Sequence, residues 1–436
     1  MIFLLFQSLK IRFVQVADKS NMAQPFTFCT FSQKRMDKSI GFGSYCVHRG
    51  EDKATTRSHA LPIYPTSSFD FASLEQGQAI FSGSEKGHLY GRFGNPTVDA
   101  VAEKLTGLET FGLDLEASGI LVSSGMSAIS TLMLALLQPG DAILTQGNLY
   151  GGTTELFRSV LAPLGFDVIF TDLSNHERVA DLLAQKPNVR VVYFETPANP
   201  TMACVDIQAL SDLAHAHQAY AVADNTFCTP YLQQPFAFGA DFIVHSTTKY
   251  LNGHGNSVAG FIAGKDCEVM EGPVFSTMKL AGTNSNAWDA WLIANGLKTL
   301  ELRMERHSEN GMRVAQFLAG HPQVDRVNYV GLLSHPDHQL AKKQMRRFGG
   351  MLSFELKGGL KAGEALMRAL SFCILAPTMG DVDTLVMHPA SMSHRNVPRD
   401  LRLENEITDG LVRLSVGIEN VADIVNDLEN GLKELK

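Results

Sequence analysis

The sequence predicts an α/β fold: a large, mostly parallel β-sheet of seven strands covered by helices, followed by a smaller C-terminal α/β domain. Between residues 97 and 284, short apolar runs of strand length alternate with segments of helical periodicity. This alternation is typical of a parallel sheet with helices on both faces. Beyond Gly282 a long helical stretch begins a second region. With 436 residues, 45% of them hydrophobic, the chain can form the cores of roughly two or three domains.

The elements of the large domain, which we assign to residues 97–284, follow from its apolar runs. Strands are expected at residues 120–122, 142–145, 168–171, 189–194, 219–223, 242–244 and 258–263, and helices at 98–108, 127–137, 155–164, 177–184 and 207–217. In such sheets, ligands bind beyond the carboxyl ends of the strands. The residues that follow each strand are therefore the first candidates for a site.

The smaller domain is assigned to residues 285–436. Residues 288–318 are expected to form one long helix or a bent pair of helices. Strands are expected at 324–330, 351–355, 385–388 and 411–416, and helices at 362–370 and 421–435.

The N-terminal part of the chain lacks this regularity. Residues 1–35 start with a short apolar run broken by polar residues, and we interpret them as a disordered or mis-started extension, with Met36 as an alternative start. Residues 36–96 are irregular and rich in Gly, Ser and Pro. They are predicted to form an extended arm that contributes to the site of a neighbouring subunit.

Composition excludes several classes of protein. A net charge of −8 gives no general attraction to nucleic acid or to anionic membranes, so neither is expected as a partner. The six cysteines form no CxxC pair and no cluster with zinc-ligand spacing, so no metal site is predicted. They fit a reducing compartment, and no segment looks transmembrane, so we expect a cytoplasmic protein.

The segment 241–255 carries the strongest chemical signal. A buried strand, residues 242–244, is followed by Ser246, Thr248 and Lys249 and then by a glycine-rich loop. A lysine at the end of a core strand is either a surface residue that opens a loop or an amine whose pKa is lowered by burial. The second alternative suits a Schiff base with pyridoxal phosphate (PLP), with the hydroxyls beside the phosphate.

Polar residues of the required types also follow other strands. Gly125 and Met126 open a helix, where free N–H groups could bind a phosphate or simply form an ordinary helix start. Tyr150 either stacks on a planar ring or packs as a half-buried side chain. Asn199 and Asp224 end two strands, and Asp224 suits a protonated pyridine nitrogen, although both residue types also favour turns.

Three further residues have two interpretations each. Arg413 lies inside an apolar strand, where it forms either a structural salt bridge or a site for a substrate carboxylate. Tyr90 and Arg92 lie between glycines in the arm, either as surface residues or as phosphate ligands.

Taken together, these motifs resemble the Cys/Met-metabolism (trans-sulfuration) family of PLP enzymes over about residues 42–435. This family includes cystathionine γ-synthase, the cystathionine lyases, methionine γ-lyase and the O-acylhomoserine sulfhydrylases. The resemblance rests on Tyr90-Gly-Arg92 with Asn95-Pro96-Thr97, Ser124-Gly125-Met126, Leu149-Tyr150-Gly151-Gly152, Glu195-Thr-Pro-Ala-Asn199-Pro, Asp224-Asn225-Thr226, His245-Ser246-Thr247-Thr248-Lys249-Tyr250 and Arg413-Leu-Ser415-Val-Gly417.

The resemblance implies the PLP-dependent aminotransferase-like fold (fold type I), PLP as cofactor and a small amino-acid substrate. It implies that Lys249, Tyr150 and Asp224 are catalytic: Lys249 holds PLP and moves protons, Tyr150 stacks on the ring, and Asp224 keeps its nitrogen protonated. The implied cofactor-binding set is Tyr90, Arg92, Gly125, Met126, Tyr150, Asn199, Asp224, Thr226, Ser246, Thr248 and Lys249, and the substrate-binding set is Arg413, Thr378 and Asn199. A homotetramer of active dimers is also implied, with Tyr90 and Arg92 acting on the neighbouring subunit.

The resemblance implies elimination or replacement at a side-chain carbon of a sulfur-containing or acylated amino acid. We expect a carbon–sulfur lyase that performs γ-elimination on methionine, homocysteine or cystathionine. The alternative is γ-replacement on an O-acylhomoserine, and a second alternative is a binding homologue without turnover. Two departures bear on specificity. Gly152 stands where methionine γ-lyases usually carry a cysteine. Thr378-Met379-Gly380 stands where many members read Ser-Leu-Gly, and Pro377 replaces the Glu common in the cystathionine enzymes.

Overall fold

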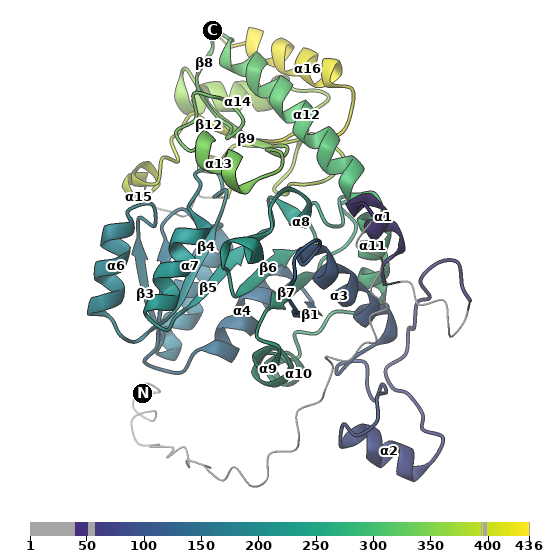
Figure 1. Ribbon diagram of the computed structural model, residues 1–436. Helices are drawn as coiled ribbons and strands as arrows, with labels where there is room; N and C mark the ends of the chain where they lie inside the picture. The colour runs from purple at the N-terminus through teal and green to yellow at the C-terminus, as the bar shows by residue number, and fades with distance from the viewer. Residues whose placement is uncertain (1–39, 51–56, 394, 396–398, 436) are drawn as a thin grey trace, which may run out of the picture.

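A computed structural model describes residues 40–50, 57–393, 395 and 399–435 (Figure 1). The expected extension, residues 1–35, lies outside the described residues. The larger sheet has seven strands in the order β1 (Ser118–Val122), β7 (Gly260–Gly264), β6 (Phe242–Ser246), β5 (Tyr220–Asp224), β4 (Val189–Glu195), β2 (Ala142–Gln146) and β3 (Asp167–Thr171). Only β7 runs antiparallel to its neighbours. The prediction of a seven-stranded, mostly parallel sheet is confirmed.

Helices cover both faces of this sheet, because successive strand residues point to opposite sides. On β4, Val191 and Tyr193 pack into one buried cluster, whereas Val192 and Phe194 pack into another. The first face carries α4 (Gly125–Leu136) and the π-helical turn Leu156–Leu161; the other carries α3 (Pro96–Glu109), α6 (His176–Gln185), α7 (Ile207–Ala216) and α11 (Ala287–Leu297). The strands that carry the site are therefore packed between buried side chains on both faces of the sheet.

The smaller domain is formed by the C-terminal part of the chain and lies at the top of Figure 1, in green and yellow. Its five-stranded sheet has the order β10 (Ile374–Leu375), β11 (Leu385–Met387), β12 (Leu411–Ser415), β9 (Met351–Leu356) and β8 (Val324–Asn328). All neighbouring pairs except β10–β11 are antiparallel. Apolar residues of α12 (Leu300–Ala319), α14 (Gly359–Ala369) and α16 (Val421–Lys433) pack with the sheet in one buried cluster.

The structure adds elements to the expected ones in the arm and in the smaller domain, and it decides between the two expected alternatives for residues 288–318. The arm contains two helices, α1 (Phe42–His48) and α2 (Leu74–Phe81), where we expected irregular chain. Phe42 and Cys46 of α1 are buried in the core of their own chain, so this part of the arm is not free. The stretch 288–318 is a bent pair, since α11 ends before α12 begins at Leu300, and the short strand β10 was not expected.

The remaining elements are short connections. They are α5 (Gly151–Glu155), a 3₁₀ turn (Ala162–Leu164), α8 (Thr229–Leu232), a 3₁₀ turn (Pro235–Phe238), α9 (Cys267–Val269), a π-helical turn (Met270–Val274), α10 (Phe275–Ala281), α13 (His338–Gln344), a 3₁₀ turn (Pro389–Ser391) and α15 (Arg399–Glu404). Across the described part of the chain, we find no helix with the length and apolar character needed to cross a bilayer.

Candidate active site

Four strands of the large sheet end at the same edge and carry the candidate residues there. β1 and β6 both pair with β7, and Val122 and Ser246 lie on either side of Gly260. β5 lies beside β6 and β4 lies beside β5, with Glu195 opposite Asp224 in the register. The residues that were selected because they follow strands are therefore neighbours in the fold.

The N-terminus of α4 forms a close-fitting seat beside Ser246. Ser124 caps the helix, its hydroxyl accepting a hydrogen bond from the Ser127 N–H at 3.0 Å. A Cβ atom on Gly125 would lie 2.7 Å from the Cβ of Ser246, and one on Gly260 would lie 2.0 Å from the carbonyl oxygen of Ser124. Glycine is therefore required at both positions for this close approach. The first N–H groups of α4, those of Gly125 and Met126, have no helical acceptor and can bind an anion.

Asp224 is held in place by two hydrogen bonds, one to each carboxylate oxygen. The Tyr193 hydroxyl donates to Oδ2 at 3.1 Å, and the Thr226 N–H donates to Oδ1 at 3.0 Å. The Thr226 hydroxyl in turn accepts from the Ser246 N–H at 2.9 Å. Asp224 and the phosphate seat are thus joined through Thr226. Thr248 faces inward, and its hydroxyl donates to the carbonyl of Ala259 at 3.3 Å.

Lys249 links the two domains. Its Nζ donates to the hydroxyl of Thr378 at 2.8 Å. Burial lowers the pKa of Lys249, the positive charge of Arg413 lowers it further, and Asp381 partly opposes both. A lysine in this environment gives up its proton more readily than a surface lysine, which suits a nucleophilic amine.

Arg413 projects from β12 toward the same region. It is only 5% exposed, and it donates to Asn199 Oδ1 at 3.3 Å and to the carbonyl of Thr378 at 2.8 Å. No carboxylate of the described residues lies within ion-pair distance of it, so the structural salt bridge that we considered is absent there. Burial lowers the pKa of Arg413 to about 10. A buried guanidinium whose partners among the described residues are neutral oxygens is suited to an incoming carboxylate.

Tyr150 lies at the start of α5, and its side chain is 49% exposed. Its backbone N–H donates to Glu195 Oε2 at 2.8 Å. The ring covers the position where a side chain at residue 152 would begin: a Cβ on Gly152 would lie 2.6 Å from Cε1 of Tyr150 and 3.3 Å from the sulfur of Met126. Gly152 therefore lets the Tyr150 ring lie close to the start of α4.

Glu195 is a site residue that the sequence analysis quoted in a motif but did not select. It is 5% exposed at the end of β4, and its two carboxylate oxygens accept from the N–H groups of Tyr150 and Asn199. Burial and the neighbouring charge of Asp224 raise the pKa of Glu195. The available signal was its position as a carboxylate at the end of a strand, the same signal that selected Asp224.

Tyr90 and Arg92 lie elsewhere on this chain. Arg92 donates to the carbonyl of Lys279 on α10, and its guanidinium lies 4.9 Å from the ring centre of Phe93. Tyr90 is 45% exposed. Among the described residues, neither side chain bonds to Lys249, Asp224 or the start of α4. Tyr90 and Arg92 therefore make no bond to the candidate site residues of their own chain.

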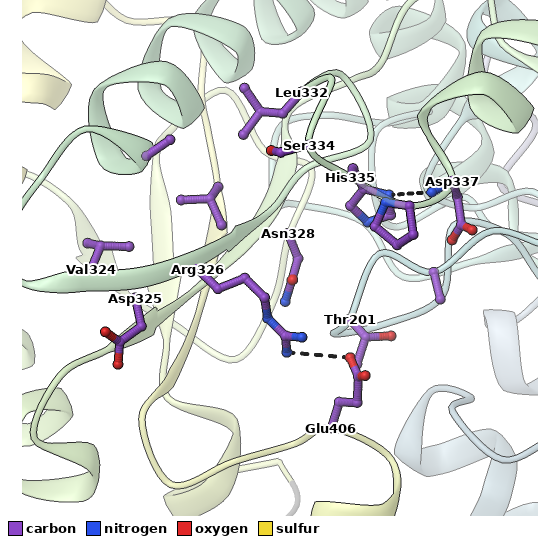
Figure 2. Close-up of a pocket in the computed structure, with 14 residues that line it drawn as sticks. Thr201, Val324, Asp325, Arg326, Asn328, Leu332, Ser334, His335, Asp337 and Glu406 are labelled. Atoms are coloured by element: carbon purple, nitrogen blue, oxygen red, sulfur yellow. Dashed lines mark hydrogen bonds and ion pairs between the residues drawn. The ribbon is translucent and has the colours of Figure 1, made fainter.

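A cavity of about 330 Å³ lies apart from these residues (Figure 2). Arg326 and Glu406 form an ion pair of 3.4 Å beside it, and Asn328 and His335 also line it. Lys249, Asp224 and Arg413 are not among its lining residues. Its nearest link to the site is through Thr201, two residues after Asn199.

Comparison with known proteins identifies the family. The model of the family described as Cys/Met metabolism PLP-dependent enzymes matches residues 43–433. The chain belongs to this family. An L-methionine gamma-lyase of Fusobacterium nucleatum subsp. polymorphum is 46% identical over 400 residues, which cover 91% of this chain and 99% of that protein. A cystathionine beta-lyase of Lactococcus lactis subsp. cremoris is 41% identical, with 89% and 98% covered.

Solved structures of family members agree in fold. A cystathionine gamma synthase from Xanthomonas oryzae pv. oryzae, crystallised with aminoacrylate and cysteine, superimposes with a TM-score of 0.85 at 37% identity and covers 91% of this chain and 98% of that one. The predictions of family, of fold type I and of a PLP-dependent enzyme are therefore confirmed.

The residues present fit PLP, the cofactor of this family. The seat at Gly125 and Ser246 is closely packed and rich in N–H and hydroxyl groups, which suits a phosphate. Asp224 offers a fixed carboxylate, and Lys249 offers a buried amine.

Proposed function

We propose that this protein is a carbon–sulfur lyase that performs γ-elimination on a sulfur amino acid (methionine, homocysteine or cystathionine), releasing a 2-oxoacid, ammonia and a thiol. The carrying observation is the 46% identity over 91% of the chain to a protein named L-methionine gamma-lyase. Bound PLP supplies an electron sink that stabilises negative charge on the substrate carbons. The remaining roles fall to residues of this chain.

We assign the substrate's α-carboxylate to Arg413, with Asn199 and Thr378 holding the guanidinium in place. This assignment is supported by burial without a carboxylate partner among the described residues. Lys249, whose pKa is lowered, accepts and returns a proton at the substrate, and Tyr150 acts as the second acid or base above the ring. Asp224 holds positive charge on the pyridine nitrogen.

We further propose a homotetramer of active dimers in a cytoplasmic setting. In this assembly, Tyr90 and Arg92 bind the cofactor phosphate of the neighbouring subunit, joining Gly125, Met126, Ser246 and Thr248. The proposal is supported by the contacts of Arg92, which among the described residues bonds to the Lys279 carbonyl and lies over the Phe93 ring rather than bonding to the site of its own chain. In the described part of the chain, Cys46, Cys204, Cys228 and Cys373 are buried thiols outside any disulfide, which supports a reducing compartment.

One assay separates elimination from replacement. The purified enzyme with PLP is incubated with L-methionine, L-cystathionine and O-acetylhomoserine, each with and without cysteine or sulfide. The proposal expects 2-oxoacid from a sulfur amino acid without any added thiol. Product formed only from O-acetylhomoserine and only with a thiol would establish γ-replacement, the alternative that similarity to cystathionine gamma synthase favours. Cofactor binding without product from any substrate would indicate a binding homologue.

A further inference from the structure

Glu195 occupies an unfavourable place for a carboxylate. It lies at the carboxyl end of β4, almost fully buried, directly opposite Asp224 on β5. Two carboxylates side by side in a buried sheet edge repel each other when both are ionised. A glutamate held in this position therefore needs an explanation from its contacts.

The contacts of Glu195 are two backbone N–H groups from two different loops. Oε2 accepts from the N–H of Tyr150 at 2.8 Å, and Oε1 accepts from the N–H of Asn199 at 3.3 Å. The Glu195 backbone is itself fixed, because its N–H donates to Gln146 Oε1 at 3.2 Å and its carbonyl accepts from Gln146 Nε2 at 3.1 Å. Glu195 thus holds the start of α5 and the loop after β4 at a set separation.

Each of these loops carries a proposed site residue. The loop after β4 places Asn199, whose Oδ1 accepts from Arg413. The start of α5 places the Tyr150 ring beside Met126. A continuous series of hydrogen bonds therefore runs from Tyr150 through Glu195 and Asn199 to Arg413.

We propose that Glu195 is a positioning residue that fixes the Tyr150 ring and the Arg413 guanidinium relative to each other, so that the cofactor ring and the substrate carboxylate are aligned together. This inference rests on the roles proposed above for Tyr150 and Arg413. The two N–H groups approach different oxygens, so one side chain holds both loops only if it presents an acceptor atom on each side. An amide in its place presents one oxygen and one NH₂ group, so one loop loses its acceptor and the other is no longer held at a fixed separation from it.

The test compares Glu195→Gln with a matched control, Asp427→Asn. Asp427 is also a buried carboxylate that accepts two backbone N–H bonds, from Ser371 and Cys373 at 2.9 Å each, but it lies on α16 in the smaller domain. Both variants lose the same kind of contact. Steady-state kinetics are measured on the PLP-loaded enzymes, and amide hydrogen exchange on the PLP-free proteins.

For Glu195→Gln, we expect kcat to fall and KM to rise, each by about tenfold or more, because both loops are loosened. Amide exchange should become faster in the peptides that contain Tyr150 and Asn199. Asp427→Asn should change neither kinetic constant and neither peptide. The inference is overturned if Glu195→Gln leaves exchange at both loops unchanged, or if it changes only one of the two kinetic constants.

Tyr150→Phe and Arg413→Lys, measured in parallel, separate this inference from the proposed function. If Arg413→Lys raises KM and Tyr150→Phe lowers kcat while Glu195→Gln behaves like Asp427→Asn, only the positioning role is lost. If Arg413→Lys and Tyr150→Phe are both like the unmodified enzyme, the site assignment itself is wrong, and the inference is overturned with it.

Discussion

In the seven-stranded sheet, the candidate site residues occupy or follow the last residue of a strand, whereas in the five-stranded sheet Arg413 lies in the middle of β12. Asp224 and Ser246 end β5 and β6, and Gly125 follows β1. Arg413 is paired instead on both sides, with Ser353 of β9 and Met387 of β11. The large sheet thus builds its part of the site from loops, and the small sheet builds its part from a strand interior.

This difference predicts a division of labour. Loops at strand ends bring several groups together around one cofactor, because the carboxyl ends of parallel strands lie at the same edge of the sheet. A side chain from the interior of a paired strand is held more rigidly and can serve as a fixed anchor. Substitutions in the first region should therefore affect the chemical step, and substitutions at Arg413 should affect substrate binding.

The largest expected effect is that of Lys249→Ala. Without the amine, the cofactor has no covalent attachment and the substrate proton has no acceptor, so turnover should be abolished. Borohydride reduction followed by mass spectrometry should detect no PLP fixed to this variant. Lys357→Ala, which removes an exposed lysine, serves as the control and should retain both properties. A Lys249→Ala protein that still traps PLP would show that another lysine carries it.

Asp224→Ala should lower kcat by about 10²–10⁴-fold, since it leaves a buried cationic ring nitrogen without its partner, at a cost of about 3–5 kcal/mol. Comparison with Asp224→Asn separates charge from shape, because the amide oxygen can still accept from Tyr193 or Thr226. Near-normal turnover of the alanine variant would remove Asp224 from its assigned role.

Arg413→Lys should raise KM by about 10–100-fold with a smaller change in kcat, because an ammonium cannot make the paired contacts of a guanidinium with a carboxylate. Initial rates over a wide range of substrate concentration test this split. If kcat falls as much as for Asp224→Ala while KM stays constant, the division between the two sheets is wrong.

Gly152→Ala should reduce kcat several-fold, since the new methyl group would displace the Tyr150 ring or the Met126 sulfur. Gly151→Ala is a close control, because among the described residues a Cβ there would meet the carbonyl oxygen of Ser393 alone, at 3.7 Å. Equal kinetics for the two variants would mean that the Tyr150 ring adapts without cost.

The smallest expected effect is a shift in the pH dependence of PLP attachment. It tests the electrostatic contact between Lys249 of the large domain and Arg413 of the smaller one. The charge of Arg413 disfavours the ammonium form of Lys249, so Arg413→Met should raise the pKa of Lys249. Only the neutral amine bonds to PLP. The rate of PLP attachment to the PLP-free protein should therefore reach its half-maximum at a higher pH in this variant. Arg368→Met, at an exposed position, should leave the profile unchanged.

Candidate residues that lie beside a strand could be selected from the local pattern of the sequence. Lys249 and Asp224 could be selected because strand and turn signals are local, and each lies immediately beside an apolar run. Glu195 carried the same strand-end signal, but its proposed positioning role depends on the register of β4 with β5 and on contacts to a distant loop, which local pattern does not reveal. The hydrogen bond from Lys249 to Thr378 joins residues 129 positions apart, which no local signal predicts.

The N-terminal arm, residues 36–96, also shows where local sequence signals fail to predict structure. Gly41 and Gly43 favour a loop, yet the segment between residues 42 and 48 is helical because Phe42 and Cys46 pack into the core beside α3 and α12. Tertiary packing overrides weak local preference in such short segments.

Thr378 has an implication for engineering. Its hydroxyl receives the Lys249 amine and its carbonyl receives the Arg413 guanidinium, so a single residue fastens groups from both domains. Replacing the 377–380 segment with that of a relative, in order to alter substrate choice, should therefore disturb the Lys249 amine and the Arg413 guanidinium together. Successful exchanges will have to carry compensating changes in both partners, rather than treating that turn as an independent module.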